Sequence, residues 1–413
     1  MKYDYSDIID PLLDWFYSNA RSLVWRDNPI PYFVWISEVM LQQTRVEAVK
    51  SYFDRFIGEL PDVYALASVE DDKLYKLWEG LGYYNRAKNL KKAAEIIVND
   101  YNGQIPADYD ALLTLPGIGS YTSGAISSIA FQIPQPAVDG NVLRVTKRVA
   151  GSYDDITKAS VKKELEDNLR SIMPPECPGD FNQSLMELGA LICIPNGRPL
   201  CDTCPIAHLC NANNLGIQME LPVKPAKKKR TKEEKTILLI EHNNEYAIRK
   251  RDSKGLLAGL WELPHIEGKL TIEELEIYLI KKGLENFRIE SLGDAKHIFS
   301  HIEWHMVGYF VHICEPQVNG EPESKVIIDE LQFNRELKEK LIFNDSQSEL
   351  KVSEAYSNYD SEKDDSYKDV NLTINDSSKD LDYSENYTWA TKEIIDLKYS
   401  LPTAFKAYYN FIQ

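Results

Sequence analysis

The chain has 413 residues, of which 43% are hydrophobic and 11% aromatic, and its net charge is −17 at pH 7. This length favours two or three domains, and the apolar content excludes a wholly disordered chain. No uncharged run approaches the roughly 18 apolar residues of a membrane span. The acidic start MKYDYSDIIDPLLDWF is unlike a signal peptide, so we expect an intracellular protein.

The acidic charge is unevenly distributed along the chain. Residues 1–230 carry 25 Lys and Arg against 29 Asp and Glu, whereas residues 231–413 carry 22 against 35. Residues 345–386 alone hold 12 acidic and 4 basic side chains. A low isoelectric point argues against a nucleic-acid partner. Because one local segment sets much of it here, a DNA partner for the rest of the chain is not excluded.

Residues 5–220 are expected to be mostly helical. Apolar residues recur there at helical spacing, and Pro and Gly separate the helical segments. The segments are 8–19, 33–57, 86–100, 121–131, 141–150, 160–172 and 181–193. The charged stretch PVKPAKKKRTKEEK that follows, at 222–235, predicts an exposed linker.

The remainder, 236–413, is expected to form a smaller α+β domain. TILLIEHNNEYAIRKR predicts two strands around a turn. Further strands and a helix are predicted from GLWELP, HIFSHIEWHMVGYFVHI and TWATKEIIDLKYS. The segment 345–386 is rich in Ser, Asp, Asn, Lys and Tyr, so it could not bury enough apolar surface to offset its conformational entropy. We expect a disordered acidic insertion there.

Four of the six cysteines are clustered, at Cys193, Cys201, Cys204 and Cys210, with the spacing C-x7-C-x2-C-x5-C. Four thiolates so close together suit a [4Fe–4S] cluster. Zinc is the alternative, because sites of four cysteines also bind it. The isolated Cys177 and Cys314 are expected to be packing residues.

The run TLPGIGSYTSGAI at 114–126 predicts a tight hairpin between two helices. Gly117 and Gly119 would let the backbone approach a partner closely, and amide N–H groups at the start of the second helix could bind phosphate. This is the helix-hairpin-helix pattern of DNA binding that does not depend on sequence. An ordinary turn between helices is the alternative.

Two acidic residues are candidate catalytic groups. Glu38 is the only charged residue between Asp27 and Arg45, and burial in such a stretch would raise its pKa, as a general acid requires. The alternative is a Glu on a solvated stripe. Asp139 and Asn141 precede an apolar helical run, where both residue types cap helices. A carboxylate at a helix N-terminus could also stabilise a cation in a reaction.

These features together resemble the helix-hairpin-helix DNA glycosylases that carry an iron–sulfur loop, and among them the adenine DNA glycosylase (MutY) family. The resemblance covers about 20–265 almost continuously, then 293–312 and the C-terminus. The matching runs are LVWR (23–26), SEVMLQQTRV (37–46), WEGLGYYNRAKNL (78–90), LPGIGSYTSGAI (115–126), VDGNVLRV (138–145), FNQSLMELGALIC (181–193) and FSH (299–301).

The resemblance implies a fold of two domains. An all-α helix-hairpin-helix glycosylase domain would span 1–221, with the [4Fe–4S] loop at 193–210. After the linker 222–235, a Nudix-like domain that recognises 8-oxoguanine would span 236–413. The long insertion near 345–386 departs from the family pattern, as does the spacing of seven rather than six residues between the first two cysteines.

The resemblance also implies roles for individual residues. Glu38 matches the acid that protonates nitrogen 7 of adenine, Asp139 the carboxylate that stabilises the sugar oxocarbenium ion, and Tyr121 and Asn141 their supports. The pocket for the flipped adenine is matched by Trp25, Arg26 and Glu187, the wedges into the duplex by Gln43 and Tyr83, and the loop that reads 8-oxoguanine by Phe299, Ser300 and His301.

The family's activity is monofunctional hydrolysis of the N-glycosidic bond of adenine mispaired with 8-oxoguanine or guanine, in base excision repair. The resemblance therefore implies a [4Fe–4S] cofactor and double-stranded DNA with such a mispair as the partner. It further implies a monomer, cytoplasmic and nucleoid-associated in a bacterium.

Three other functions are weighed against this one. An enzyme similar to endonuclease III would carry a Lys nucleophile in LPGVGRKTA, where this chain has Tyr121. A Nudix hydrolase is suggested by GLLAGLWELP (255–264), but TIEELEIYLIKKGL (271–284) lacks the metal-binding R-E-x-x-E-E run, which leaves a binding relic of that fold. A non-catalytic DNA-binding protein would be favoured by loss of Glu38 or Asp139, and both are present.

Overall fold

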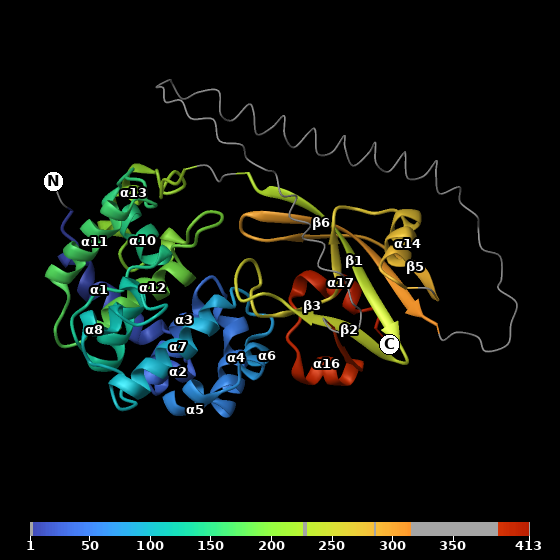
Figure 1. Ribbon diagram of the computed structural model, residues 1–413. Coiled ribbons are helices and arrows are strands. Elements are labelled where there is room, and N and C mark those ends of the chain that lie inside the picture. The colour runs from blue at the N-terminus through green and yellow to red at the C-terminus, as the bar shows by residue number, and fades with distance from the viewer. Residues whose placement is uncertain (1–2, 226–228, 285, 315–386, 413) are drawn as a thin grey trace, which may run out of the picture.

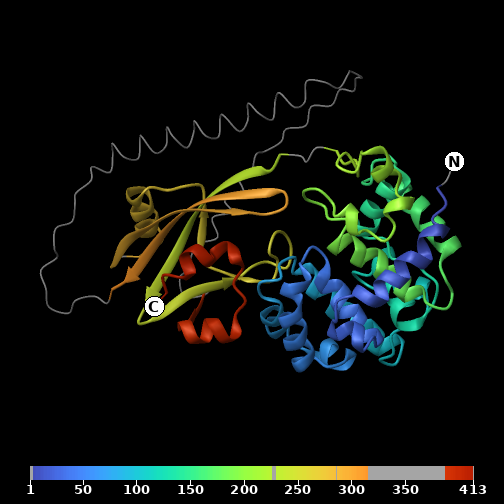
Figure 2. The same cartoon turned by 180° about the vertical axis from the view of Figure 1, so that it is seen from behind.

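A helical part and a part built on a β-sheet lie side by side in the computed structural model (Figure 1, Figure 2). The structure describes residues 3–225, 229–284, 286–314 and 387–412. The acidic insertion expected at 345–386 falls outside these residues. In the described part of the chain, no helix is both long and apolar enough to cross a bilayer.

The helical part agrees with the mostly helical N-terminal half expected from the sequence. Its α-helices are α1 (Ile9–Asn19), α2 (Val24–Asp27), α3 (Pro31–Leu41), α4 (Val46–Glu59), α5 (Val63–Ser68), α6 (Asp71–Trp78), α7 (Asn85–Asp100), α8 (Tyr109–Leu113), α9 (Ser120–Ala125), α10 (Gly140–Ala150), α11 (Ala159–Ile172), α12 (Pro178–Leu191) and α13 (Asn211–Leu215). Residues Ile126–Ala130 extend α9 as a short π-helix.

The predicted helical segment 33–57 is interrupted between α3 and α4. Gln43 has φ +60° there, a conformation that no right-handed helix contains. The break therefore places Glu38 close to the end of a short helix rather than in the middle of a long one.

Two apolar cores hold the helices together. One is built around Trp35, Phe53 and Trp78 of α3, α4 and α6. The other is built around Leu12 and Phe181, from α1 and α12, with α10 packed beside them. The first residues of helices α9 and α10 line one shared cavity.

The second part is a sheet with the strand order β3-β2-β1-β6-β5, in which β4 also pairs with β1 and β7 with β2. Strands β1 and β6 are parallel, whereas β1–β2 and β5–β6 are antiparallel. The strands are β1 (Thr231–His242), β2 (Glu245–Lys250), β3 (Trp261–Glu262), β4 (His265–Glu267), β5 (Phe287–Ile298), β6 (Ile302–Ile313) and β7 (Thr388–Ala390). Strand β1 begins inside the range 222–235 for which the sequence predicts a linker.

Helices cover both faces of the sheet, which gives the expected α+β layers (Figure 1). Ile237 and Leu239 of β1 pack on one face with the C-terminal helix α17 (Lys406–Tyr409), near α16 (Lys392–Lys398). Leu238 and Ile240 pack on the other face with α14 (Ile272–Lys281). Because both faces are buried, the strand reads as the unbroken apolar run TILLI rather than as an alternation.

The two parts are joined by packing and by polar contacts. Leu260 of the sheet part is fully buried in the core of α3, α4 and α6. Asp72 of α6 accepts hydrogen bonds from Lys250 Nζ at 2.7 Å and Trp261 Nε1 at 3.1 Å. Glu79 Oε1 accepts one from the backbone N–H of Leu401 at 3.1 Å. These contacts fix the loops of the two parts against each other.

Candidate active site

A cavity of 740 Å³ lies in the helical part, where α2, α3, α9, α10 and α12 meet. Most of the residues that the sequence singles out as catalytic or pocket-forming line it together. They are Trp25, Arg26, Glu38, Gln43, Gly119, Tyr121, Asp139, Asn141 and Glu187. The hairpin residue Gly117 does not line it.

Glu38 enters the cavity from the apolar helix α3 and is only 6% exposed. The hydroxyl of Tyr121, on α9, donates a hydrogen bond to Glu38 Oε2. Burial raises the pKa of Glu38 to about 7, and the nearby charge of Asp139 adds to the rise against the opposing effect of the Tyr121 hydrogen bond. The alternative of a solvated Glu is wrong, and the carboxyl is poised to hold a proton near neutral pH.

Asp139 is the N-cap of α10, so the same carboxyl caps the helix and is the candidate catalytic group. Its Oδ1 accepts the N–H of Val142 at 2.7 Å and its Oδ2 accepts Asn141 Nδ2 at 2.7 Å. Burial raises the pKa of Asp139, while these two hydrogen bonds act to lower it. The carboxylate is therefore oriented by its donors and is half-buried at the cavity.

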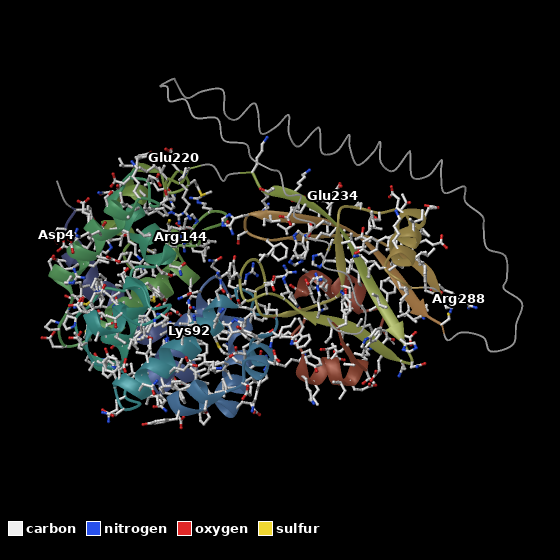
Figure 3. All side chains as sticks on the ribbon, viewed as in Figure 1. Asp4, Lys92, Arg144, Glu220, Glu234 and Arg288 are labelled. Carbon is white, nitrogen blue, oxygen red and sulfur yellow. The ribbon has the colours of Figure 1, made fainter. Side chains whose placement is uncertain are left out.

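Asn141 is itself held by a buried arginine that the sequence analysis does not identify. Arg144 Nη2 donates to Asn141 Oδ1 at 2.9 Å and to the Gly189 carbonyl at 2.8 Å, and its Nε donates to the Cys193 carbonyl at 2.7 Å. Arg144 lies within the helical part (Figure 3). It joins the start of α10 to α12 and to the first residue of the cysteine loop.

Glu187, in the same cavity, has electrostatic surroundings opposite to those of Glu38. It is 1% exposed and pairs with Arg21 Nε at 2.6 Å and Arg26 Nη2 at 2.7 Å. Burial acts to raise the pKa of Glu187, but the two arginines lower it to about 2. Trp25 packs nearby, edge-on to Phe53 at 5.1 Å. Glu187 is thus an ionised group that fixes the wall of the cavity.

The hairpin between α8 and α9 has the expected tight geometry. Gly117 has φ +78°, and a Cβ there would lie 2.7 Å from Asn89 Cβ, so a side chain at this position is excluded. Gly119 is the N-cap of α9, with open space around its Cα. The hairpin therefore presents bare backbone amides at the rim of the cavity.

A second cavity, of 650 Å³, lies between the two parts of the molecule. Tyr83 lines it from the loop before α7, and Phe299, Ser300 and His301 line it from the β5–β6 turn. The Tyr83 hydroxyl and Ser300 Oγ are 3.1 Å apart and share a hydrogen bond. The structure therefore brings together four residues that are far apart in the chain, although Gln43 stays with the first cavity.

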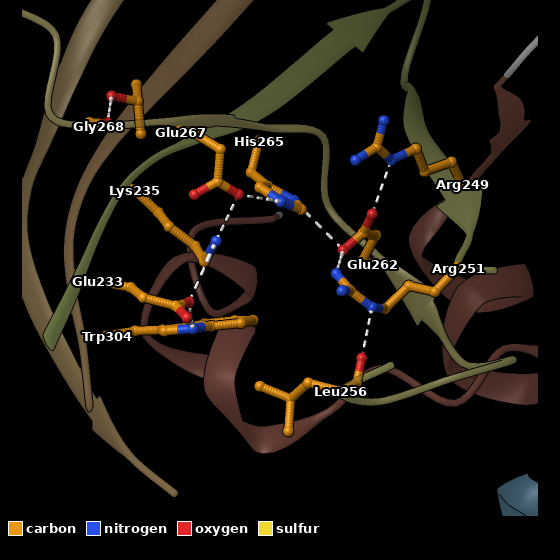
Figure 4. Close-up of polar contacts among 11 residues, drawn as sticks. Glu233, Lys235, Arg249, Arg251, Leu256, Glu262, His265, Glu267, Gly268 and Trp304 are labelled. Atoms are coloured by element: carbon orange, nitrogen blue, oxygen red, sulfur yellow. Dashed lines mark hydrogen bonds and ion pairs between the residues drawn. The ribbon is translucent and has the colours of Figure 1, made fainter. Parts of the chain in front are cut away.

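One wall of this second cavity is set by a buried carboxyl network (Figure 4). Glu262 of β3 is 2% exposed and pairs with Arg249 Nε at 2.7 Å, with Arg251 Nη1, and with His265 Nδ1 at 3.2 Å. Arg251 Nε also donates to the Leu256 carbonyl at 3.0 Å. Leu256 lines the cavity, so the network holds the loop that forms its wall.

The position of a Nudix catalytic run is occupied by an ordinary helix. Within residues 271–284 the helix α14 spans Ile272–Lys281, and Thr271 with Glu274 makes a capping box at its start. The side chain of Glu274 accepts the backbone N–H of Thr271 at 2.9 Å. This acid is therefore used to cap a helix.

The four clustered cysteines line one small cavity beside α10 and α12. Arg148 Nη1 donates to Cys193 Sγ at 3.3 Å, and burial raises the pKa of Cys204 to about 12. Among the described residues, no three His, Cys, Asp or Glu side chains stand in a geometry that holds a metal ion. The donor set nevertheless fits an iron–sulfur cluster: four sulfur atoms surround one space, and a guanidinium is placed against the charge that bound thiolates would carry.

A hairpin between helices, with buried carboxyls in an adjoining cavity, defines a base-excision glycosylase of the helix-hairpin-helix class. Residues 36–171 match the family model of the HhH-GPD superfamily of base excision DNA repair proteins, and residues 236–341 match the NUDIX domain. The chain is 36% identical over 306 residues to the adenine DNA glycosylase of Buchnera aphidicola subsp. Acyrthosiphon pisum, covering 74% of this chain and 85% of that protein.

Mammalian relatives give the same result. The adenine DNA glycosylase of Rattus norvegicus is 33% identical over 366 residues, covering 72% of this chain and 70% of that protein. The human protein is 32% identical over 353 residues, covering 71% and 64%. The chain belongs to the adenine DNA glycosylase family.

Proposed function

We propose that this chain hydrolyses the N-glycosidic bond of adenine opposite 8-oxoguanine or guanine in double-stranded DNA, as a monofunctional enzyme acting as a monomer. The observation that carries the proposal is the pair of carboxyls in one cavity, the buried Glu38 and the half-buried Asp139, with different hydrogen-bond partners. Two carboxyls with distinct surroundings can divide the roles of acid and anion.

Glu38 is proposed as the general acid. Adenine leaves readily only after its ring is protonated, and it must first be turned out of the stack. With a pKa of about 7, Glu38 holds a proton at neutral pH and gives it up to a ring nitrogen. The Tyr121 hydroxyl occupies Oε2, which leaves Oε1 for the proton that is transferred.

Asp139 is proposed to stabilise the oxocarbenium ion that forms as the bond breaks. The N–H of Val142 and the amide of Asn141 fix its two oxygens, so the carboxylate needs no reorganisation when the cation develops. Trp25, Arg26 and Glu187 would surround the flipped base, and Gln43 would enter the duplex beside it.

The hairpin and the second cavity are proposed as the DNA-binding and lesion-reading surfaces. Gly117 and Gly119 would place backbone amides against a phosphate. Undamaged adenine carries no lesion, so specificity must come from the opposite base, and Tyr83 with Phe299, Ser300 and His301 would read it. We propose 1–221 as the glycosylase domain and 236–413 as the recognition domain.

We propose Cys193, Cys201, Cys204 and Cys210 as ligands of a [4Fe–4S] cluster. The cluster would supply four metal–thiolate bonds that order the loop 193–210. Cys204→Ser should lose the broad visible absorption of the cluster and weaken DNA binding. A colourless Cys204→Ser protein with unchanged affinity for DNA would contradict a structural role.

The decisive experiment is single-turnover excision of adenine from an A:8-oxoguanine duplex, compared with an A:T duplex. We expect rapid release from the first and none above background from the second. Ser300→Ala combined with His301→Ala should slow excision from A:8-oxoguanine more than from A:G, because a site built to hydrogen-bond a group rejects the analogue that lacks it. Equal rates on A:8-oxoguanine and A:T would overturn the proposal.

A further inference from the structure

Arg86, at the start of α7, is a buried cation held by backbone carbonyls. It is 9% exposed, and its acceptors within the described part of the chain are backbone carbonyls and the Thr44 hydroxyl, with no carboxylate among them. Burial lowers the pKa of Arg86 to about 10, so the side chain is charged at neutral pH. Its Nε is buried without a hydrogen-bond partner, and all of its hydrogen bonds run through the two terminal nitrogens.

The carbonyls that Arg86 contacts belong to two separate segments. Nη1 donates to the carbonyls of Val39, Met40 and Gln42 at 2.8, 2.9 and 2.7 Å, where α3 ends. Nη2 donates to the carbonyls of Leu81 and Gly82 at 3.0 and 3.1 Å, in the loop before α7. Carbonyls at a helix end lack intrahelical partners and carry partial negative charge, so a guanidinium suits them.

Each segment continues directly into a residue with an unfavourable backbone conformation. Gln43 follows the Gln42 carbonyl and has φ +60°, and Tyr83 follows the Gly82 carbonyl and has φ +49°. Residues other than glycine remain in this region only where their surroundings hold them there, and such residues gather at functional sites. The same guanidinium bonds the peptide that precedes each of them.

The planar shape of the Arg86 guanidinium also contributes to its contacts. Arg86 lies 5.3 Å from the ring centre of Trp78 and 5.7 Å from that of Tyr83, and Trp78 Nε1 donates to the Gly82 carbonyl at 3.1 Å. A lysine could occupy the space and keep the charge. It could not offer two nitrogens in a fixed plane to two sets of carbonyls at once.

We propose that Arg86 is a positioning residue that couples the Gln43 turn to the Tyr83 loop, so that the two segments meet the DNA duplex as one rigid unit attached to the helix of Glu38. The contacts of Arg86 are independent of the proposed function, but the effect on excision that we infer from them rests on it. Because Tyr83 bonds Ser300, the coupling would connect the surface that reads the opposite base to the helix that carries the acid.

The test compares Arg86→Lys with the control Arg55→Lys. Arg55 also lies over an aromatic ring, that of Tyr52 at 4.7 Å, and donates one hydrogen bond, to the Leu77 carbonyl at 3.1 Å, but it contacts neither segment. Hydrogen–deuterium exchange of the free protein should speed up in 42–45 and 80–84 together in Arg86→Lys, and in neither segment in Arg55→Lys. Faster exchange in only one segment, or in neither, would overturn the coupling.

Activity measurements then test the consequence. Arg86→Lys should slow single-turnover excision from A:8-oxoguanine by about 10- to 100-fold, which corresponds to about 1.4–2.8 kcal/mol in the activation free energy, and should reduce the preference over A:G. The fluorescence of 2-aminopurine in place of adenine should show less base flipping. A loss that is equal on both duplexes, with normal flipping, would overturn the positioning role.

The two proposals fail in distinguishable ways. A wild-type protein that does not excise adenine from A:8-oxoguanine would refute the proposed function, while the exchange experiment still decides the coupling. If Arg86→Lys does not fold, native-state exchange of the wild-type protein in rising urea replaces it. The two segments should then open in a single step, and separate openings would overturn the inference.

Discussion

Two buried glutamates, one in each part of the molecule, have opposite electrostatic surroundings. Glu38 in the helical part has a hydroxyl as its hydrogen-bond partner and a second carboxyl nearby, and its pKa is raised to about 7. Glu262 in the sheet part is buried to a similar degree. Burial acts to raise the pKa of Glu262 as well, but His265, Arg249 and Arg251 lower it to about 2.

The comparison shows that burial alone does not decide what a carboxyl does. A buried carboxyl that has no ion-pair partner has a raised pKa and tends to keep its proton. The same carboxyl between cations stays ionised and serves as a structural anion. Glu187 belongs to the second kind even though it lies in the same cavity as Glu38. The active cavity therefore leaves one carboxyl with a hydroxyl as its partner and pairs the other with two arginines.

Replacing the acid should give the largest effect. Glu38→Gln keeps the shape of the side chain and removes its proton, so single-turnover excision should fall by about 10²- to 10⁴-fold. The pKa of Glu38 is raised in the folded state, so its contribution to stability is present below pH 4.5 and is lost as the pH rises through about 7. Thermal unfolding of Glu38→Gln at pH 8 should therefore be no easier than that of the wild type.

The control for this substitution is Glu47→Gln, whose side chain is 73% exposed on α4. It should retain wild-type excision and stability. Near-normal single-turnover rates for Glu38→Gln would mean that the acid is wrongly assigned.

Replacing the structural anion should destabilise the sheet part and leave the chemistry of the cavity intact. Glu262→Gln leaves Arg249 and Arg251 without a counter-ion, and breaking a buried pair in this way costs about 3–5 kcal/mol. Because the pKa of Glu262 is lowered, its contribution is present above pH 4.5 and is lost as the pH falls towards 2. Urea unfolding at pH 7 and at pH 3 should show the difference shrinking in acid.

Glu267→Gln is the control, since its 73% exposed side chain joins the same network only at its edge, through His265 Nε2 at 3.6 Å. Its other partner, the buried Lys235, keeps Glu233 at 3.6 Å, and water reaches the exposed side chain at 267, so Glu267→Gln should cost less than Glu262→Gln. A loss of stability as large in Glu267→Gln as in Glu262→Gln would contradict the distinction between the two carboxyls.

The raised pKa of Glu38 also predicts a pH profile. Only the protonated acid can act, so the single-turnover rate should be flat in acid and fall about tenfold per pH unit above pH 7. Rates measured on pre-bound duplex would separate this effect from DNA binding. A rate that rises between pH 7 and pH 9 would exclude Glu38 as a proton donor.

The smallest effect is expected at the loop that forms the wall of the second cavity. Arg249 and Arg251 both pair with Glu262, but only Arg251 also holds the Leu256 carbonyl. Arg251→Met should lower the preference for A:8-oxoguanine over A:G by about fivefold, in line with the loss of one hydrogen bond of about 1 kcal/mol. Arg249→Met should preserve the preference, and an equal change in both variants would remove the loop from lesion reading.

Much of the fold could be predicted from local patterns. The helical periodicity, the Pro-Gly hairpin and the apolar run of β1 each depend on neighbours in the chain, and the structure agrees with them. The sequence does not indicate the break at Gln43, where φ is positive and the preceding Gln42 carbonyl bonds Arg86, 44 positions away. The apolar pattern of 33–57 continues across it without a signal.

The candidate site likewise contains residues that local sequence patterns identify and residues that they do not. Glu38 and Asp139 could be selected from sequence because an isolated acid in an apolar run and an acid before a helix are local signals. Arg21, Arg86 and Arg144 could not, since their functions come from partners that the sequence does not place beside them. The contact of Arg21 with Glu187 spans 166 positions.

The sequence by itself thus determined which groups are present: two carboxyls, four clustered cysteines, a hairpin and a second domain. Only the tertiary structure decided the charge state of each carboxyl. A pKa depends on the desolvation and the counter-charges that packing brings together, and those neighbours come from distant helices. The same residue type has a raised pKa at Glu38 and a lowered pKa at Glu262 because the fold buries the first beside a hydroxyl and a second carboxyl and places the second between cations.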